Sequence, residues 1–189
     1  MLAIIIAVFA VITDQISKWL VVNNLELYET VPFIPKVMSF YHTRNKGAAF
    51  SMLSDKPWIF MVVSVIAMAI IIYLLYSEYK RHPLLTVSLS MVLGGAVGNM
   101  IDRFRLGYVV DFFHVDFFEF AVFNVADCFI SIGAVLLGVY VVFFETKVEK
   151  RILAEKQAKE AAIAEESENP DESVTEAIET HADKESENG

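Results

Sequence analysis

Two aspartates stand beside long apolar segments, where a charged side chain is costly. Asp111 lies in the sequence Val-Val-Asp-Phe-Phe, and Asp127 lies at the head of an apolar run. A carboxylate at the depth of membrane hydrocarbon costs on the order of 2.5 to 3.5 kcal/mol, even on permissive insertion scales. Ionisable residues in such places are therefore candidates for a functional site.

Two carboxylates that share a confined site suit acid–base chemistry on water. They cannot both ionise easily, so one keeps its proton while the other acts as a base. Together they can activate a water molecule and protonate a carbonyl oxygen. Asp111 and Asp127 are therefore candidates for a pair with the chemistry of an aspartic peptidase.

Serine and metal chemistry find less support. The sequence contains no Gly-x-Ser-x-Gly motif. Ser17 adjoins Lys18, but neighbouring positions on a helix diverge by roughly 100 degrees, so their side chains face apart. Among the histidines, only His114 lies near enough to Asp111 and Asp116 in the sequence to begin a metal site. A role in loop packing, or simple surface exposure, would also account for a histidine at this position. We expect no metal and no cofactor.

Other polar residues recur at helical spacing within apolar segments. Asp14 and Lys18 are four residues apart and can pair along one helix face, in an architectural or a functional role. Asn124 precedes Asp127 by three residues and is expected to face the same way. Both pairs are candidates for one polar layer, which would also hold Asp111.

A glycine-rich segment leads into a further polar cluster. Gly94 and Gly98 form a small-xxx-small face that permits close helix approach. Asn99 is followed by Asp102 and Arg103 at offsets of three and four residues, so all three can lie on adjoining faces of one helix. The sequence predicts a polar cap at the end of this helix.

Four apolar segments are long enough to position these residues within a bilayer, which takes ~20 mostly apolar residues in a helix. They comprise residues 1–22, 57–76, 84–101 and 120–144 of a 189-residue chain that is 56% hydrophobic, with a mean hydropathy of +0.50. The first segment lacks a basic flank and a small-x-small cleavage site, so we interpret it as a retained span rather than a secretory signal. The predicted class is an all-α membrane protein with four transmembrane helices.

The two longer loops carry strand-like patterns. Residues 36–51 combine β-formers with a glycine turn, and residues 107–118 are rich in Val and Phe. We expect a small extracytoplasmic β-rich element from these loops. The phenylalanines between residues 112 and 123 suit an interfacial belt as well as a binding groove.

Basic residues near the span ends indicate the orientation. They occur in the short link at 77–83 and directly after the fourth span, which favours the cytoplasmic side for both. Basic residues in the loop at 23–56 oppose this assignment, but most lie far from span ends. We therefore expect a multi-pass protein with both termini in the cytoplasm and an active site near the outer leaflet.

The net charge of −9 belongs to the C-terminal tail. Residues 145–189 contain 14 acidic and 6 basic side chains, which leaves −1 for residues 1–144. After residue 165 the apolar content is too low for a core. We expect a four-span catalytic domain over residues 1–147 and an acidic, disordered cytoplasmic tail over residues 148–189, solvated rather than bound to a partner.

Four ordered blocks of sequence resemble bacterial lipoprotein signal peptidase, also called signal peptidase II. They are Asn-Lys-Gly-Ala-Ala-Phe-Ser at 45–51, Gly-Gly-Ala-Val-Gly-Asn-Met-Ile-Asp-Arg at 94–103, Gly-Tyr-Val-Val-Asp-Phe at 107–112 and Phe-Asn-Val-Ala-Asp at 123–127. The resemblance covers about residues 1–145 and excludes the tail. It implies a four-span aspartic endopeptidase of the bacterial inner membrane, which removes the signal peptide from prolipoproteins bearing a diacylglyceryl group on the cysteine after the cleavage site.

The resemblance also implies roles for single residues. Asp111 and Asp127 match the catalytic pair. The positions that match residues lining the substrate pocket are Asn45, Asn99, Arg103 and Asn124. The positions that match supporting residues are Asp14, Lys18, Gly47 and Asp102. The implied partners are diacylglyceryl-modified prolipoproteins and membrane lipids; we expect a monomer that binds no nucleic acid.

Two other functions remain open from the residues alone. A proton- or ion-coupled transporter also keeps carboxylates in its spans, but it should carry repeated halves and polar residues through the full bilayer depth. A membrane adaptor would act through its tail. Deletion after Lys150 separates the adaptor from a peptidase, because peptidase activity should survive that deletion.

Overall fold

The computed structural model describes residues 1–47, 57–78 and 81–168. Residues 48–51, which complete the first of the four sequence blocks, lie outside the described residues, as do Lys56, Lys80 and residues 169–189 of the tail. The chain divides into two units, Met1–Val142 and Phe143–Gly189.

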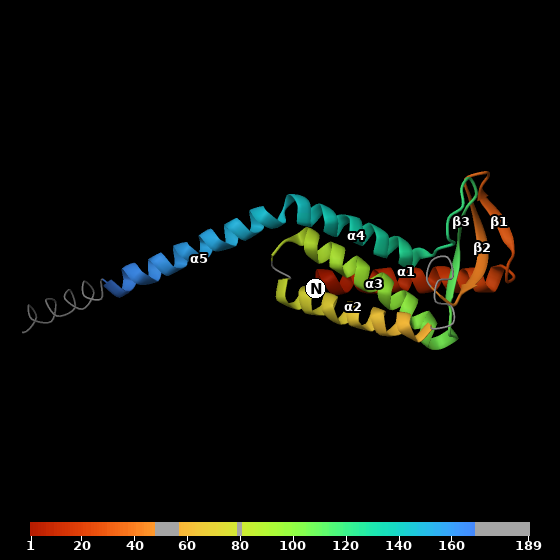
Figure 1. The fold of residues 1–189 in the computed structure, drawn as a ribbon, viewed down its shortest axis with the longest axis horizontal. Helices are drawn as coiled ribbons and strands as arrows, with labels where there is room; N and C mark the ends of the chain where they lie inside the picture. The colour runs from red at the N-terminus through yellow and green to blue at the C-terminus, as the bar shows by residue number, and fades with distance from the viewer. Residues whose placement is uncertain (48–56, 79–80, 169–189) are drawn as a thin grey trace, which may run out of the picture. The chain divides into compact units, whose positions relative to one another are not determined.

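Within the described residues, four helices are long and apolar enough to cross a membrane. They are α1 (Leu2–Asn24), α2 (Pro57–Glu78), α3 (Pro83–Leu106) and α4 (Val125–Phe143), shown in Figure 1. The four predicted spans are confirmed as helices, and their number and length support a multi-pass membrane protein.

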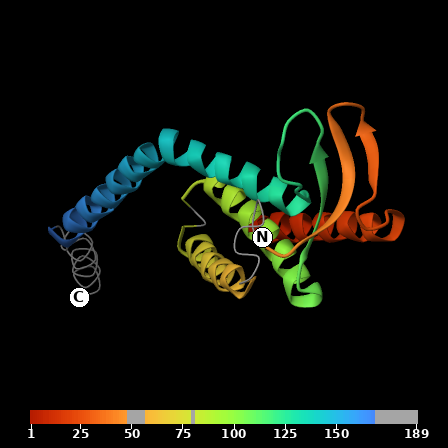
Figure 2. The same cartoon turned by 45° about the vertical axis from the view of Figure 1, so that its right-hand side comes forward.

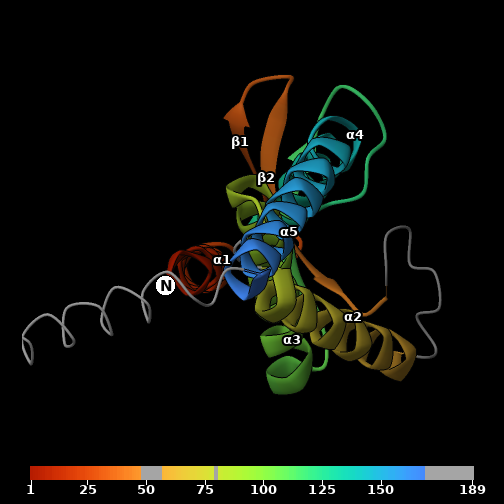
Figure 3. The same cartoon turned by 90° about the vertical axis from the view of Figure 1, so that its left-hand side faces the viewer.

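Helix α3 is the centre of this group, and glycines let its neighbours approach. A Cβ added at Gly94 would lie 2.7 Å from the Cβ of Ala10 on α1, and one added at Gly95 would meet the carbonyl oxygen of Ala126 on α4. Helix α2 also packs against α3. Figure 3 shows α1, α2 and α4 grouped around α3. The predicted small-residue face therefore serves close packing on two sides of the helix.

Helix α1 has a polar inner face and an apolar outer face. Its buried residues are Ala10, Asp14, Lys18 and Val21, which recur at intervals of three and four residues and so form one stripe. Large apolar side chains elsewhere on the helix are exposed, including those of Phe9 and Trp19. This distribution suits a helix whose outer face meets lipid and whose inner face meets other helices.

Three antiparallel strands form a small sheet in the order β1 (Thr30–Ile34), β2 (Met38–Asn45) and β3 (Val109–Val115). Figure 2 shows the sheet at the end of the helices where α1 finishes and α4 begins. Strands β2 and β3 confirm the predicted strand segments within the described residues, whereas β1 was not predicted. The protein is thus mostly helical with a small β element from the loops.

The sheet is attached to the helices through β3 and the segment that follows it. Val110 and Phe112 of β3 form a buried cluster with Val21 of α1. The carbonyl oxygen of Phe123 accepts hydrogen bonds from the N–H groups of Phe112 and Phe113, at 3.0 and 2.8 Å. Because this segment returns along β3, helix α4 begins at Val125 and not at the predicted residue 120.

In the second unit, helix α5 (Glu145–Glu168) carries exposed side chains over most of its described length. Arg151 and Glu155 form an exposed ion pair along this helix, with 2.8 Å between Nε and Oε1. The proposed boundary at residue 147 and the disorder of the tail stay predictions.

Candidate active site

Asp111 and Asp127 line one cavity of about 520 Å³. Asp111 comes from strand β3 and Asp127 from the first turn of helix α4. Asn45 of β2 and Asn99 and Arg103 of α3 border the same cavity. Side chains that are far apart in the sequence therefore meet at one site.

A tight turn after helix α3 brings Asp111 to this cavity. Gly107 ends the helix with a φ of +79°, a left-handed conformation that glycine adopts readily, and its N–H donates to the carbonyl oxygen of Arg103. The N–H of Val110 then donates to Oδ2 of Asp102 at 3.1 Å, which ties the start of β3 to α3. Helix and strand are thereby held together directly before Asp111.

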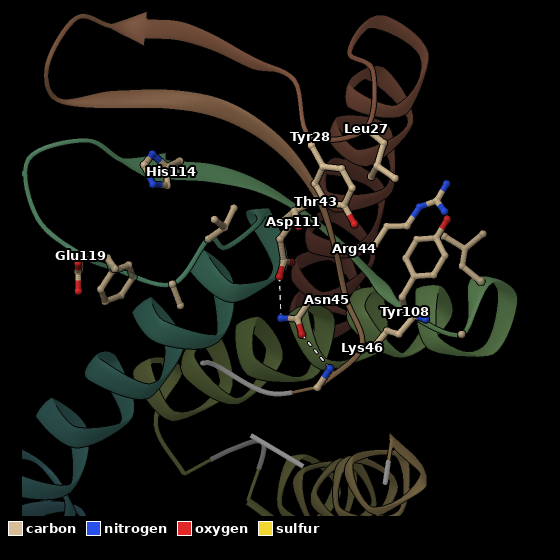
Figure 4. A pocket seen from close by; sticks show the side chains of 16 residues that line it. Leu27, Tyr28, Thr43, Arg44, Asn45, Lys46, Tyr108, Asp111, His114 and Glu119 are labelled. Atoms are coloured by element: carbon tan, nitrogen blue, oxygen red, sulfur yellow. Dashed lines mark hydrogen bonds between the residues drawn. The ribbon is translucent and has the colours of Figure 1, made fainter. Parts of the chain in front are cut away.

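Two asparagine amides hold the Asp111 carboxyl group. Nδ2 of Asn45 donates to Oδ2 at 2.8 Å, a bond drawn in Figure 4, and Nδ2 of Asn124 donates to Oδ1 at 2.6 Å. Burial of the side chain raises the pKa of Asp111 to about 7. The hydrogen bond from Asn45 opposes this rise in pKa, whereas the negative charge of Asp127 adds to it. Asp111 therefore titrates near neutral pH.

Asp127 and Asn124 form a reciprocal cap at the start of helix α4. The backbone N–H of Asp127 donates to Oδ1 of Asn124 at 3.0 Å, and the N–H of Asn124 donates back to Oδ2 of Asp127 at 3.1 Å. The remaining carboxyl oxygen of Asp127 accepts a hydrogen bond from Nδ2 of Asn99 at 2.8 Å. Since Asn124 also binds Asp111, one residue fixes the two aspartates relative to each other.

A buried lysine lies beneath the pair. Nζ of Lys18 contacts Oδ2 of Asp14 at 2.9 Å, Oδ2 of Asp102 at 3.0 Å and Oδ1 of Asn99 at 2.9 Å, which uses all three ammonium donors. The predicted pair of Asp14 and Lys18 is thus formed. Because Lys18 can only donate, Asn99 must turn its oxygen toward the lysine and its NH₂ group toward Asp127. Lys18 therefore sets the orientation of an amide that binds Asp127.

Gln15 belongs to the same network, although the sequence interpretation missed it. Its Nε2 lies 3.2 Å from Oδ2 of Asp14, 3.1 Å from Oδ1 of Asp102 and 3.2 Å from the carbonyl oxygen of Gly98. Gln15 thus bridges α1 and α3 through the acids that hold Lys18. The available signal was a further polar side chain in the first apolar segment, directly after Asp14.

Arg103 and Gly47 complete the set of predicted site residues. Arg103 is half-buried and borders the cavity. Its guanidinium group interacts electrostatically with Asp111, Asp127 and Asp102. The N–H of Gly47 donates to Oδ1 of Asn45 at 3.0 Å, which leaves the NH₂ group of Asn45 for Asp111. The structure brings all the predicted site residues together, either around the cavity or in the network beneath it.

The alternatives considered for the sequence have a different geometry. The hydroxyl of Ser17 donates to the carbonyl oxygen of Asp14 at 2.7 Å, while Lys18 binds three other groups, so the two form no dyad. Nδ1 of His114 lies 3.1 Å from Oδ1 of Asp116, whose other oxygen accepts a hydrogen bond from Ser39 at 2.7 Å. His114 is therefore hydrogen-bonded to Asp116 beside the sheet, with its side chain partly exposed.

Comparison with known proteins gives concordant results. The sequence model of the family described as "Signal peptidase (SPase) II" matches residues 6–143. A lipoprotein signal peptidase of Symbiobacterium thermophilum is 45% identical over 149 residues, which cover 78% of this chain and 98% of that protein. One of Enterococcus faecalis is 48% identical over 147 residues, covering 78% of this chain and 85% of that protein.

Solved structures resemble the chain as well. One, described as a bacterial membrane enzyme structure at 2.3 Å resolution, has a TM-score of 0.71 and 32% identity, and the match covers 74% of this chain and 87% of the other. A second, described in the same words at 1.9 Å resolution, has a TM-score of 0.70 and 31% identity, with coverage of 75% and 93%. Sequence and fold comparisons therefore agree over the four-helix unit.

Proposed function

The chain belongs to the signal peptidase II family, and from this premise we propose that it cleaves the signal peptide from diacylglyceryl-modified prolipoproteins by an aspartic mechanism. The arrangement of Asp111 and Asp127 carries this proposal, because both line one cavity and both bind Asn124. Two carboxyl groups held in this way can share a water molecule and a proton.

In the first step, Asp127 acts as the base and Asp111 as the acid. Water attacks the carbonyl carbon of the scissile peptide bond and passes a proton to Asp127. Asp111 donates its proton to the carbonyl oxygen, a role that suits a buried carboxyl group with a pKa of about 7. The product of this step is a neutral tetrahedral diol.

In the second step the two aspartates exchange roles. Asp127 gives its proton to the leaving nitrogen as the C–N bond breaks, and a hydroxyl group of the diol returns a proton to Asp111. The signal peptide leaves with a new carboxyl group, and the mature lipoprotein leaves with a new amino group. Water is the nucleophile, so the reaction needs no covalent intermediate.

Arg103 and Asn99 support these steps in different ways. The Arg103 guanidinium borders the cavity beside both aspartates, where a positive charge offsets negative charge that develops during the attack. Asn99 orients Asp127 through the hydrogen bond from its NH₂ group, and Lys18 holds that amide in the required orientation. The network beneath the pair thus serves to preorganise it.

We place the sheet and the catalytic pair on the extracytoplasmic side of the inner membrane, with both termini in the cytoplasm. An even number of spans puts the termini on one side, and the basic residues after α4 favour the cytoplasm for that side. Residues 1–147 would form the catalytic domain and residues 148–189 a tail without a part in cleavage. Because one chain supplies every residue proposed for the site, a monomer suffices for the reaction.

Cleavage of a diacylglyceryl-modified precursor by the purified protein tests the proposal. We expect the wild-type protein to release the signal peptide and Asp111→Asn and Asp127→Asn each to lose at least about 10²-fold in rate, the usual scale of lost acid–base catalysis. Asp116→Asn is a matched control, because Asp116 binds Ser39 and His114 at the sheet and does not border the cavity.

Three outcomes would contradict the proposal. Retained cleavage by either Asn variant of the pair would exclude the aspartic mechanism, and a requirement for added metal would do the same. Failure of the folded wild-type protein to cleave the lipidated precursor would exclude the substrate class. Circular dichroism of each variant shows whether a lost rate reflects lost folding.

A further inference from the structure

A second cavity, of about 1050 Å³, adjoins the one that holds the catalytic pair. Both are bordered by Asn45, Gly47, Asp111 and residues 120–122. The smaller cavity continues along α4 to Ser131 and Ile132, whereas the larger one is bordered by the sheet and its loops. The two cavities therefore meet at Asp111. The smaller one extends along a helix, and the larger one is lined by the sheet and its loops.

Charged side chains stand on two sides of the larger cavity, which we call the outer cavity. Figure 4 shows Arg44 and Tyr108 on one side of Asp111, and His114 and Glu119 on the other. Lys46 also borders the cavity, two residues after Arg44 at the end of β2. One side of the outer cavity is thus cationic, and it is separated from the acidic side chain of Glu119.

Within the part of the chain that the structure describes, Arg44 is held by an aromatic ring and has no carboxylate partner. Its Cζ atom lies 4.8 Å from the centre of the Tyr108 ring, an arrangement that restricts the guanidinium group and leaves its edge open. Among residues 1–47, 57–78 and 81–168, neither Arg44 nor Lys46 forms an ion pair, and both side chains are exposed. Two unneutralised cations therefore face solvent beside the catalytic pair.

A substrate cleaved at Asp111 must extend away from it in two directions. The signal peptide of a prolipoprotein is apolar, which suits the cavity that continues along α4 between membrane helices. The mature segment, which follows the modified cysteine, leads away from the apolar signal peptide and suits the outer cavity with its charged side chains. This direction brings the residues after the cysteine to Arg44 and Lys46.

We propose that Arg44, Lys46 and Tyr108 form a specificity subsite that favours acidic residues in the mature segment directly after the modified cysteine. This assignment rests on the proposed function and deepens it. A carboxylate can meet the open edge of the Arg44 guanidinium while Tyr108 supports its face. The subsite selects among precursors and takes no part in the chemical step.

The test compares two lipidated precursors that differ only in carrying Glu or Gln at the positions after the cysteine. We expect the wild-type protein to cleave the Glu precursor with about threefold higher kcat/KM, the scale of a solvent-exposed ion pair, and added salt to reduce this ratio. The double variant Arg44→Gln with Lys46→Gln should bring the ratio to about one. Arg44→Lys keeps the charge and should keep most of the preference.

Lys36→Gln is the matched control, because Lys36 is an exposed lysine at the turn between β1 and β2 and does not border the outer cavity. It should leave the Glu-to-Gln ratio unchanged. Equal cleavage of both precursors by the wild-type protein would overturn the subsite and leave the proposed function standing. Cleavage of neither precursor would overturn both.

The headgroup of an anionic lipid is the competing ligand for these cations. Assays in vesicles with and without phosphatidylglycerol separate the two sources of negative charge. If the double variant lowers kcat/KM equally for both precursors, and only in vesicles with phosphatidylglycerol, the peptide subsite is refuted. If the double variant lowers kcat/KM for the Glu precursor alone, in both kinds of vesicle, the subsite is supported.

Discussion

At the scale of single residues, Asp111 is set apart from Asp127 by its surroundings. Asp111 is 2% exposed on a strand next to the buried cluster of Val21, Val110 and Phe112. Asp127 is half-buried in the first turn of α4, where the backbone N–H of Asn124 donates to its carboxyl group. Two residues of one type thereby receive environments that suit an acid and a base, respectively.

The pKa of Asp111 predicts how cleavage depends on pH. Burial raises this pKa from 3.8 to about 7, so Asp111 carries its proton below about pH 7 and loses it above. If Asp111 must donate that proton, kcat/KM should fall as pH rises through about 7, by about tenfold for each further unit. A pH–rate profile with the lipidated precursor measures this limb.

His114→Gln is the control for this profile, because histidines also titrate near neutral pH and His114 borders the outer cavity. The falling limb should persist in this variant. A rate that instead rises through the same range would indicate a base that must lose a proton and would contradict the assignment of Asp111 as the acid.

Residue types and helical spacing were sufficient to predict most of the network. Asp14 with Lys18, and Asn124 with Asp127, stand out because polar side chains are rare in apolar segments. The contact between Arg44 and Tyr108 depends on the register of β2 against β3. That register is a property of the folded sheet, so no local pattern indicated it.

At the scale of elements, the contact between α1 and α3 holds the lysine network in place. A Cβ added at Gly98 would lie 2.6 Å from Oδ2 of Asp14. Asp14 is completely buried and bound to Lys18, so it cannot move aside freely. The predicted small-residue face therefore has a functional consequence, because it sets the distance between Lys18 and Asn99.

We expect Gly98→Ala to destabilise the protein by about 1–3 kcal/mol, the usual cost of overpacking, and to slow cleavage because α1 must move away from α3. Gly138→Ala is the matched control, since an added Cβ there meets nothing within 4 Å. Thermal unfolding and cleavage rates measure both effects. Equal behaviour of the two variants would contradict this role for Gly98.

Helices were easier to predict than strands. Long apolar runs identify spans directly, and the four observed helices follow them to within a few residues at most ends. Strand β1 was missed because its five residues, Thr-Val-Pro-Phe-Ile, include a proline, which demotes a short apolar run as a strand signal. The start of α4 was misplaced because residues 120–123 are apolar, like a span, yet Phe123 pairs with β3 instead of joining the helix.

At the scale of the whole molecule, the site residues all belong to the first of the two units. A chain that ends after Lys150 should therefore keep the cleavage rate of the full-length protein within about twofold, as surface changes away from a site usually do. Cleavage by membranes that contain equal amounts of the two proteins measures this. A chain that ends after Phe123, and so lacks α4 and Asp127, is the inactive control.

Loss of cleavage by the chain that ends after Lys150, despite normal membrane insertion, would contradict this prediction. It would indicate that the tail takes part in cleavage. The four long apolar segments predicted the membrane unit, and the four ordered sequence blocks within it predicted the site residues. The tail has no comparable motif, and its composition predicts solvation alone.

The dependence of Lys18 on two helices has a consequence for biogenesis. The ribosome delivers α1 to the translocon before α3 has been made, so Lys18 enters the bilayer with only Asp14 as a partner, one helical turn away. Asp102 and Asn99 arrive later and add to that first pairing. A nascent copy whose helices have not yet docked lacks the lysine contact that orients the Asn99 amide toward Asp127, and we expect it to cleave no precursor until assembly is finished.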